Sequence, residues 1–135
     1  MIPAKIEPLD SLAALIQSQR FEEAISLLEQ RLKTYPLEDR GWALLGQAFY
    51  NLRRYSEAVG ALRDALRLNP TQATHYADLG IALKADGRAG ESEALLREGI
   101  RRNPTHPLPC FSLANLLVSQ RRHPEALAQF QSLLK

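Results

Sequence analysis

Three prolines recur at one fixed interval along this 135-residue chain, at Pro36, Pro70 and Pro104, and the interval is 34 residues. The second and third close the similar tripeptides Leu-Asn-Pro and Arg-Asn-Pro, and a threonine follows each. A period of this length is typical of repeat architectures, in which supersecondary units stack on their neighbours. The interval predicts repeats over residues 5–38, 39–72, 73–106 and a shortened 107–135, with no linker between them.

Within a repeat, apolar residues recur at helical spacing in two separate stretches. In the second repeat the first stretch holds Trp42, Leu45 and Phe49, and the second holds Val59, Leu62 and Leu66. The third repeat shows the same two stretches on either side of Gly87, a residue type that often ends a helix. Each repeat is therefore predicted to form two helices, and no strand pattern competes with them.

The residues at these positions resemble the signature of the tetratricopeptide repeat family. The second repeat carries Trp42, Leu45, Gly46, Phe49, Ala58, Leu62, Ala65 and Pro70 at the family's spacing. The later repeats match at Tyr76, Leu79, Gly80, Leu83, Leu96 and Pro104, and at Cys110, Leu113, Ala114, Leu117, Ala126 and Phe130. The first repeat fits at Leu15, Ala24, Leu28 and Pro36 but departs from the signature at Pro8, Ser11 and Leu12.

The resemblance implies an all-α fold, a right-handed superhelical stack of antiparallel helix hairpins (an α-solenoid) in a single domain over residues 1–135. Gly46 and Gly80 keep the repeat interval, although each costs about 1 kcal/mol relative to alanine inside a helix. We expect close helix packing to offset that cost.

Composition excludes several classes of protein. The single cysteine, Cys110, permits no internal disulfide framework and no cysteine-clustered zinc site. The formal net charge of +2 is too small to indicate nucleic acid or an anionic membrane as a partner. No apolar run approaches bilayer length, and the segment from Met1 to Asp10 lacks the apolar core of a signal peptide. A soluble, cytoplasmic chain is predicted.

No residue pattern indicates catalysis, a metal or a cofactor. His75, His106 and His123 stand apart and form no spacing typical of metal ligands. The segment Gly87-Arg88-Ala89-Gly90 lacks the lysine and the preceding strand of a phosphate-binding loop, so it is interpreted as a helix turn. Cys110 occupies a core position of its repeat and is predicted to be a buried thiol rather than a nucleophile.

Charged residues also keep the 34-residue interval. The second helices are predicted to begin near Glu23, Glu57, Glu91 and Glu125 and to end near Lys33, Arg67, Arg101 and Lys135, which complements the helix dipole. A further series, Arg20, Arg54, Arg88 and Arg122, falls at the turns between paired helices. Because no complete aromatic row accompanies this series, a solvated edge is favoured over a nucleic-acid surface.

In the family, the first helix of each pair lines the inner groove. The resemblance assigns to that groove Arg40, Gln47, Tyr50, Asn51, Ile81, Lys84, Phe111, Asn115 and Val118. Apolar side chains, amides and two cations together would suit an amphipathic or extended peptide. The residue set with which some members clamp the carboxylate of a chaperone tail is missing, so that ligand is not predicted.

The sequence thus predicts a non-catalytic scaffold that binds a protein or peptide, with no cofactor and no membrane partner. Two alternatives stay open: an accessory repeat region of a larger enzyme, and a scaffold that assembles with itself. The last predicted helix offers apolar surface at Leu127, Phe130, Leu133 and Leu134, and this surface is expected to meet either a following domain in a longer parent chain or a second copy of the chain.

Overall fold

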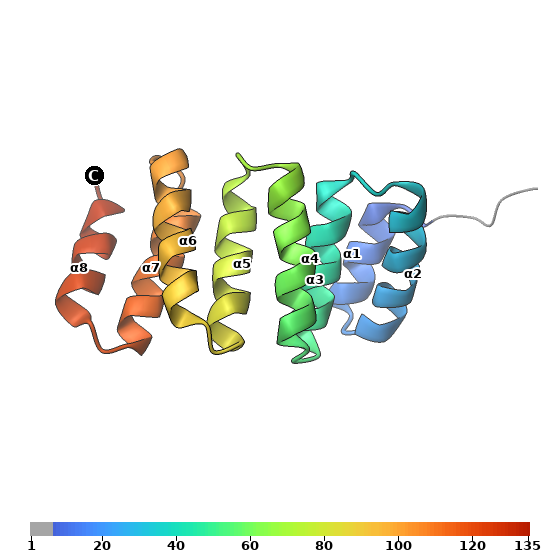
Figure 1. Cartoon of the computed structure of the whole chain (residues 1–135), viewed down its shortest axis with the longest axis horizontal. Coiled ribbons are helices and arrows are strands. Elements are labelled where there is room, and N and C mark those ends of the chain that lie inside the picture. The colour runs from blue at the N-terminus through green and yellow to red at the C-terminus, as the bar shows by residue number, and fades with distance from the viewer. Residues whose placement is uncertain (1–6) are drawn as a thin grey trace, which may run out of the picture. The chain divides into compact units, whose positions relative to one another are not determined.

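The structure is a computed structural model, and it describes residues 7–135. These residues form eight α-helices and no strand, which confirms the predicted all-α fold (Figure 1). The helices are α1 (Leu9–Gln17), α2 (Phe21–Thr34), α3 (Asp39–Asn51), α4 (Tyr55–Leu68), α5 (Ala73–Ala85), α6 (Ala89–Arg102), α7 (Pro107–Ser119) and α8 (His123–Ser132). Residues 1–6 lie outside the described part. They make up most of the segment from Met1 to Asp10, so the prediction that this segment is not a signal peptide falls largely outside the described residues.

The chain divides into two compact units, and the boundary falls between Asn69 and Pro70. In unit 1, α1 packs against α2 and α3, and α3 packs against α2 and α4. Its interior includes Leu12, Leu28 and Leu45, which are at most 5% exposed. The unit therefore consists of two helix hairpins that share one apolar core.

Unit 2 contains the other two hairpins. Helix α5 packs against α6 and α7, and α7 packs against α6 and α8. Its core cluster comprises Leu96, Leu113, Leu116, Leu117 and Ala126, all at most 2% exposed. The first helices α3, α5 and α7 begin at Asp39, Ala73 and Pro107, the residues at which the repeats were predicted to start.

Helix α1 has nine residues, whereas α3, α5 and α7 each have thirteen. Pro8 stands at its N-cap with extended backbone angles and supplies no side-chain cap. Because proline is well accommodated only at the start of a helix, it marks this late start. The departure of the first repeat from the family signature thus corresponds to a shortened helix.

The two glycines that share a repeat position lie where helices approach closely. A Cβ placed on Gly46 would stand 2.5 Å from Cγ of Leu62, and one placed on Gly80 would stand 2.7 Å from Cδ2 of Leu96. Real Cβ atoms are almost never found so near another atom. The predicted close packing is confirmed, and it offsets the helix propensity that each glycine lacks. Beside the second contact, the buried hydroxyl of Ser92 donates to the Gly80 carbonyl at 2.7 Å.

The four turns between paired helices in the described chain share one conformation. The second residue after each first helix has a positive φ: 64° at Gln19, 61° at Arg53, 81° at Gly87 and 59° at Arg121. The following N–H reaches back five residues, as from Arg54 to the Phe49 carbonyl at 2.9 Å. This is the Schellman ending of a helix, which satisfies carbonyls that the last turn leaves without a partner.

Candidate functional site

A row of uncovered side chains runs along the first helices of unit 2. On α7 the row follows intervals of three and four residues, which keep side chains on one face of a helix. Ile81 and Lys84 of α5 occupy the same repeat positions as Asn115 and Val118 of α7, and the two helices pack against each other. We call the exposed residues Ile81, Lys84, Leu108, Phe111, Asn115 and Val118 the α5–α7 face.

Most of the α5–α7 face is apolar. Ile81 is 43% exposed, Phe111 49% and Val118 43%, whereas the adjacent Leu116 and Leu117 are 2% and 0% exposed. Helix α7 therefore turns one apolar side toward the core and leaves a second one in solvent. Adjoining exposed apolar groups of this kind often mark interaction sites.

One ring of this face is held by the neighbouring helix. The centroid of Phe111 lies 6.1 Å from that of Phe130 on α8, with the planes 71° apart. An edge-to-face pair of this kind is worth about 0.5–1.5 kcal/mol beyond the area it buries. The contact thus partly fixes the exposed ring of Phe111.

The predicted groove residues of unit 1 lie on α3 and are less apolar. Arg40 is exposed and stands 3.8 Å from the carboxylate of Asp10, a solvated pair of little energetic weight. The part-buried ring of Tyr50 packs against Tyr55 at a centroid distance of 5.4 Å. The amide of Asn51 donates to the Gln47 carbonyl at 2.7 Å, so this donor is engaged within its own helix.

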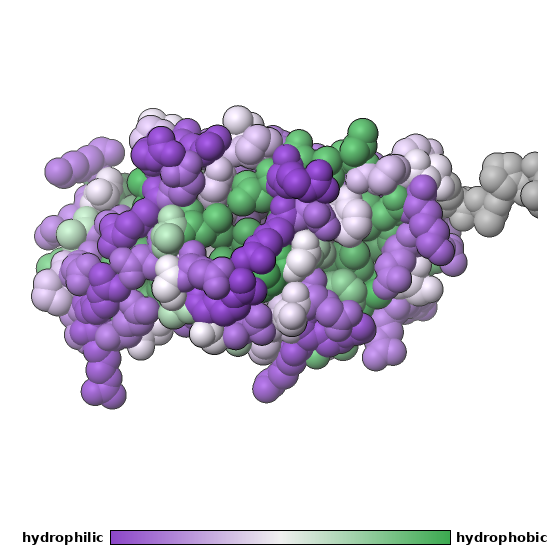
Figure 2. Space-filling view, in the orientation of Figure 1, coloured by the Kyte–Doolittle hydropathy of each residue, from purple (hydrophilic) through white to green (hydrophobic). Residues whose placement is uncertain are grey.

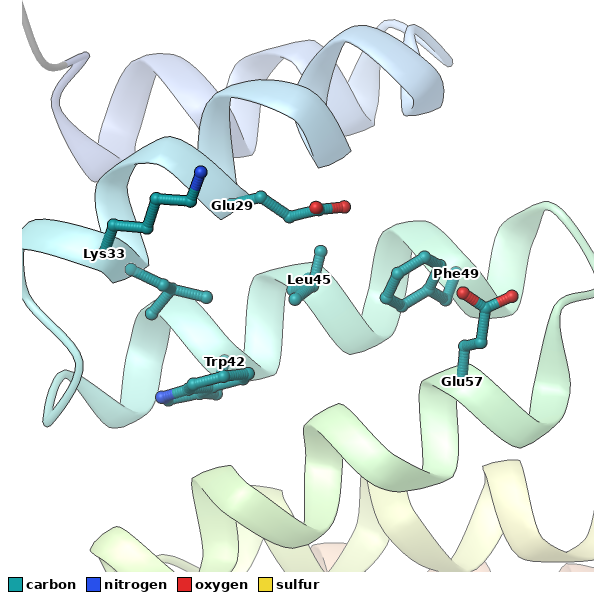
Figure 3. Close-up of a pocket in the computed structure, with 7 residues that line it drawn as sticks. Glu29, Lys33, Trp42, Leu45, Phe49 and Glu57 are labelled. Atoms are coloured by element: carbon teal, nitrogen blue, oxygen red, sulfur yellow. The ribbon is translucent and has the colours of Figure 1, made fainter.

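The sequence did not predict a pocket that lies on unit 1 between α2, α3 and α4 (Figure 3). Its volume is about 440 Å³. The lining residues are Leu32, Trp42, Leu45 and Phe49, together with Glu29, Lys33 and Glu57. Figure 2 also shows hydrophobic side chains between hydrophilic ones in the region where Figure 1 draws these helices. Trp42, Leu45 and Phe49 stand at core positions of the repeat signature, and nothing in their spacing indicates that they also line a pocket.

The arginines at the turns are each paired with an acid three residues later. Arg54 donates to both carboxylate oxygens of Glu57 at 2.8 and 2.7 Å, and the hydrogen bond from Arg54 lowers the pKa of Glu57. Ion pairs at the same repeat positions join Arg20 to Glu23, Arg88 to Glu91 and Arg122 to Glu125. The predicted Arg series and Glu series thus form one set of short-range pairs. An edge of paired arginines is a poorer phosphate surface than an edge of free ones.

Two of the histidines, His75 and His106, and the cysteine have roles in packing or helix capping. His75 is buried at 3% exposure, and His106 caps α7 by accepting from the Leu108 N–H at 3.2 Å. Cys110 is 7% exposed, as predicted for a core thiol, and burial raises its pKa. Among residues 7–135, no group of three or more His, Cys, Asp or Glu side chains is arranged to hold a metal ion.

On the last helix of unit 2, α8, several apolar side chains are uncovered. Leu127 is 57% exposed, and Leu134, just beyond the helix, is 87% exposed. Phe130 and Leu133 are only partly exposed. No helix in the described range combines the length and the apolar character needed to cross a membrane.

Comparison with known proteins agrees with this architecture. A family model described as "Tetratricopeptide repeat" matches residues 13–73, 44–107 and 77–135. A search of curated protein sequences gives no match.

Solved structures share the fold at low sequence identity. The chain is 24% identical to TTC0263, a thermophilic TPR protein of Thermus thermophilus, over 91% of this chain and 69% of that one, with a TM-score of 0.81. A crystal structure of MamA gives 20% identity over 91% and 72% of the two chains and a TM-score of 0.80. MamA 41-end from Desulfovibrio magneticus RS-1 gives 19% identity over 91% and 70%, also with a TM-score of 0.80.

Proposed function

Because this chain belongs to the tetratricopeptide repeat family, whose helix hairpins form protein-interaction scaffolds, we propose that it holds a partner polypeptide on its first helices. The α5–α7 face is the observation that carries the proposal. It combines three large apolar side chains that are each more than 40% exposed with a fixed ring at Phe111. Such a surface stabilises a complex when a partner removes it from water, at roughly 25 cal/mol per Å² of apolar area before the costs of association.

The polar members of the face would set the orientation of the partner. The exposed Asn115 amide can both donate to and accept from a peptide backbone, and the exposed Lys84 can meet a carboxylate. An amphipathic helix or an extended segment with apolar residues on one side fits this combination. In unit 1, Arg40, Gln47, Tyr50 and Asn51 stand on the equivalent helix and are proposed to serve the same purpose there.

This proposal describes a binding module that needs no cofactor and does no chemistry of its own, in one domain over residues 1–135 and in the cytoplasm. One alternative is an accessory repeat region of a larger enzyme, in which case the same face would hold a substrate protein or another domain. Both versions require a polypeptide on the α5–α7 face. They differ in whether residues beyond this sequence carry a catalytic site.

The proposal is tested by placing charge on the face. Short peptides are selected from a random displayed library against the wild-type chain, and their affinities are measured by fluorescence anisotropy. Ile81→Glu combined with Val118→Glu should weaken binding at least about tenfold, because two carboxylates would replace apolar surface that the partner buries. Both side chains are exposed, so the helical circular-dichroism signal should not change.

The matched control is Ala94→Glu, which adds a carboxylate at an exposed position of α6, away from the α5–α7 face. It should bind the selected peptides with wild-type affinity. Peptides that bind equally well to the double variant and to the control would contradict the proposed site.

A further inference from the structure

One position in the repeat carries a side chain that bonds to the proline of the preceding loop. In the second repeat, Nε1 of Trp42 donates to the carbonyl of Pro36 at 2.8 Å. In the third repeat, the hydroxyl of Tyr76 donates to the carbonyl of Pro70 at 2.9 Å. In each of these two repeats, an aromatic ring with a polar hydrogen thus joins the first helix to the proline of the loop before it. We call this junction the corner of the repeat.

The fourth repeat has Cys110 at this position, and a cysteine is too short to close the corner. Its Sγ lies 3.3 Å from the backbone oxygen of Gln129 on α8. Among residues 7–135, no donor bonds to the Pro104 carbonyl, the counterpart of the Pro36 and Pro70 carbonyls. Pro104 is exposed, so this carbonyl can bond to water and can also accept from a donor of a partner.

A pocket of about 540 Å³ occupies the corner that the ring would fill. Its lining includes Ile100, Pro104, Thr105, Cys110, Gln129 and Leu133. The volume lies within the range of about 300–1,000 Å³ found for ligand pockets. All of these residues belong to unit 2, and none belongs to the α5–α7 face.

On the second helix of each hairpin, the residue that faces this position changes in size in the opposite direction. It is small where the ring is present and larger where the ring is missing. Opposite Tyr76 stands Gly99, where an added Cβ would lie 2.8 Å from the tyrosine ring. The same repeat position holds Ala65 in the second repeat and Leu133 in the fourth. The part-buried Leu133 compensates for some of the missing ring, but the pocket shows that it does not fill the space.

We propose that this pocket receives a tryptophan or tyrosine side chain of a separate polypeptide, whose N–H or O–H donates to the Pro104 carbonyl. The occupant follows from the two filled corners, which show what such a site takes. Unit 2 cannot supply the ring, because its only tyrosine is Tyr76, which is already bonded to Pro70, and it contains no tryptophan. The inference does not depend on the function proposed for the α5–α7 face.

The probes are N-acetyl-tryptophanamide and N-acetyl-tyrosinamide, titrated into the ¹⁵N-labelled chain. Both should shift the backbone amides of Thr105, Cys110 and Leu133 with a Kd on the order of 1 mM, as expected for a single small ring with one hydrogen bond. N-acetyl-phenylalaninamide should bind about two- to tenfold more weakly than the tyrosine probe, because it cannot donate to the carbonyl. Equal affinity of these two probes would overturn the role assigned to Pro104.

The decisive variant fills the pocket from within. Cys110→Trp combined with Leu133→Ala copies the Trp42 and Ala65 pair of the second repeat, so it should fold and should lose the probe-induced shifts. The matched control, Leu133→Ala alone, keeps the pocket open and should bind the probes at least as tightly as the wild type.

Two outcomes would overturn the inference. The first is an absence of shifts in the wild type, and the second is shifts that persist in the filled variant.

Discussion

At the scale of single residues, the four turns adopt one backbone conformation with different residue types. The left-handed region costs a residue with a side chain about 1–2 kcal/mol, and glycine avoids that cost. Only one of the four turns has glycine at this position, Gly87, whereas the others use Gln19, Arg53 and Arg121. The conformation is therefore imposed by the Schellman hydrogen bonds and the packing of the two helices rather than by residue type.

A substitution at Gly87 tests this view. Gly87→Ala should lower the free energy of unfolding by about 1 kcal/mol, because alanine at a φ of 81° is strained even though its Cβ would have no atom within 4 Å. Denaturant unfolding followed by circular dichroism measures the change.

The control is Gly60→Ala, on the exposed surface of α4, where a Cβ also meets nothing within 4 Å and no positive φ is needed. It should raise the free energy of unfolding by up to about 1 kcal/mol. Two changes of the same sign would refute the argument from backbone strain.

At the scale of helices, α3, α5 and α7 begin at the residues where the repeats were predicted to start. The shared glycine positions predicted the close contacts of Gly46 and Gly80. Charge spacing also placed acids at the starts of the second helices, but it did not reveal that each is joined to the arginine three residues before it. That pairing depends on backbone angles at the N-cap, which a residue pattern does not encode.

The two pockets were not predicted for a different reason. A spacing pattern assigns Trp42 and Cys110 to one core position, but it does not show whether side chains of different size fill the space equally well. Cavities arise from small mismatches of volume summed over several helices. The exposure of Ile81, Phe111 and Val118 agrees with the predicted groove positions, while their role in binding stays a proposal.

Helix α6 carries a measurable electrostatic prediction. Hydrogen bonds from Arg101 and Arg102 lower the pKa of the Glu98 carboxyl to about 2, from an ordinary value of 4.5. A carboxyl with a lowered pKa stabilises the folded state above its unfolded pKa, and this contribution is lost as the pH falls through its folded pKa. Thermal unfolding should therefore show a decline in Tm between about pH 4.5 and pH 2.

Glu98→Gln serves as the matched comparison for this decline. The variant keeps the size of the side chain and removes its titration, so its Tm should fall less than that of the wild type over the same interval. Because the pairs are exposed, high salt should reduce the difference between the two proteins. Parallel declines for both proteins at low salt would show that Glu98 contributes nothing to the pH dependence.

At the scale of the whole molecule, the remaining question is whether copies of the chain associate. The net charge of +2 provides little long-range repulsion between copies. Leu127 and Leu134 are 57% and 87% exposed, and Phe130 lies beside them with part of its surface uncovered. We propose that this apolar end of unit 2 meets the same surface of a second copy, since a closed dimer with a self-complementary interface is the commonest oligomer.

Sedimentation velocity over micromolar to millimolar concentrations tests this proposal. The wild-type sedimentation coefficient should rise with concentration toward that of a dimer, because burying both leucines removes apolar surface from water. Leu127→Glu combined with Leu134→Glu should remain monomeric throughout, since association would then bring like charges together and bury them. Ala94→Glu, which adds charge to exposed α6, should associate as the wild type does. A wild-type chain that stays monomeric over the whole range would exclude this interface, and a double variant that still associates would place the contact on another surface.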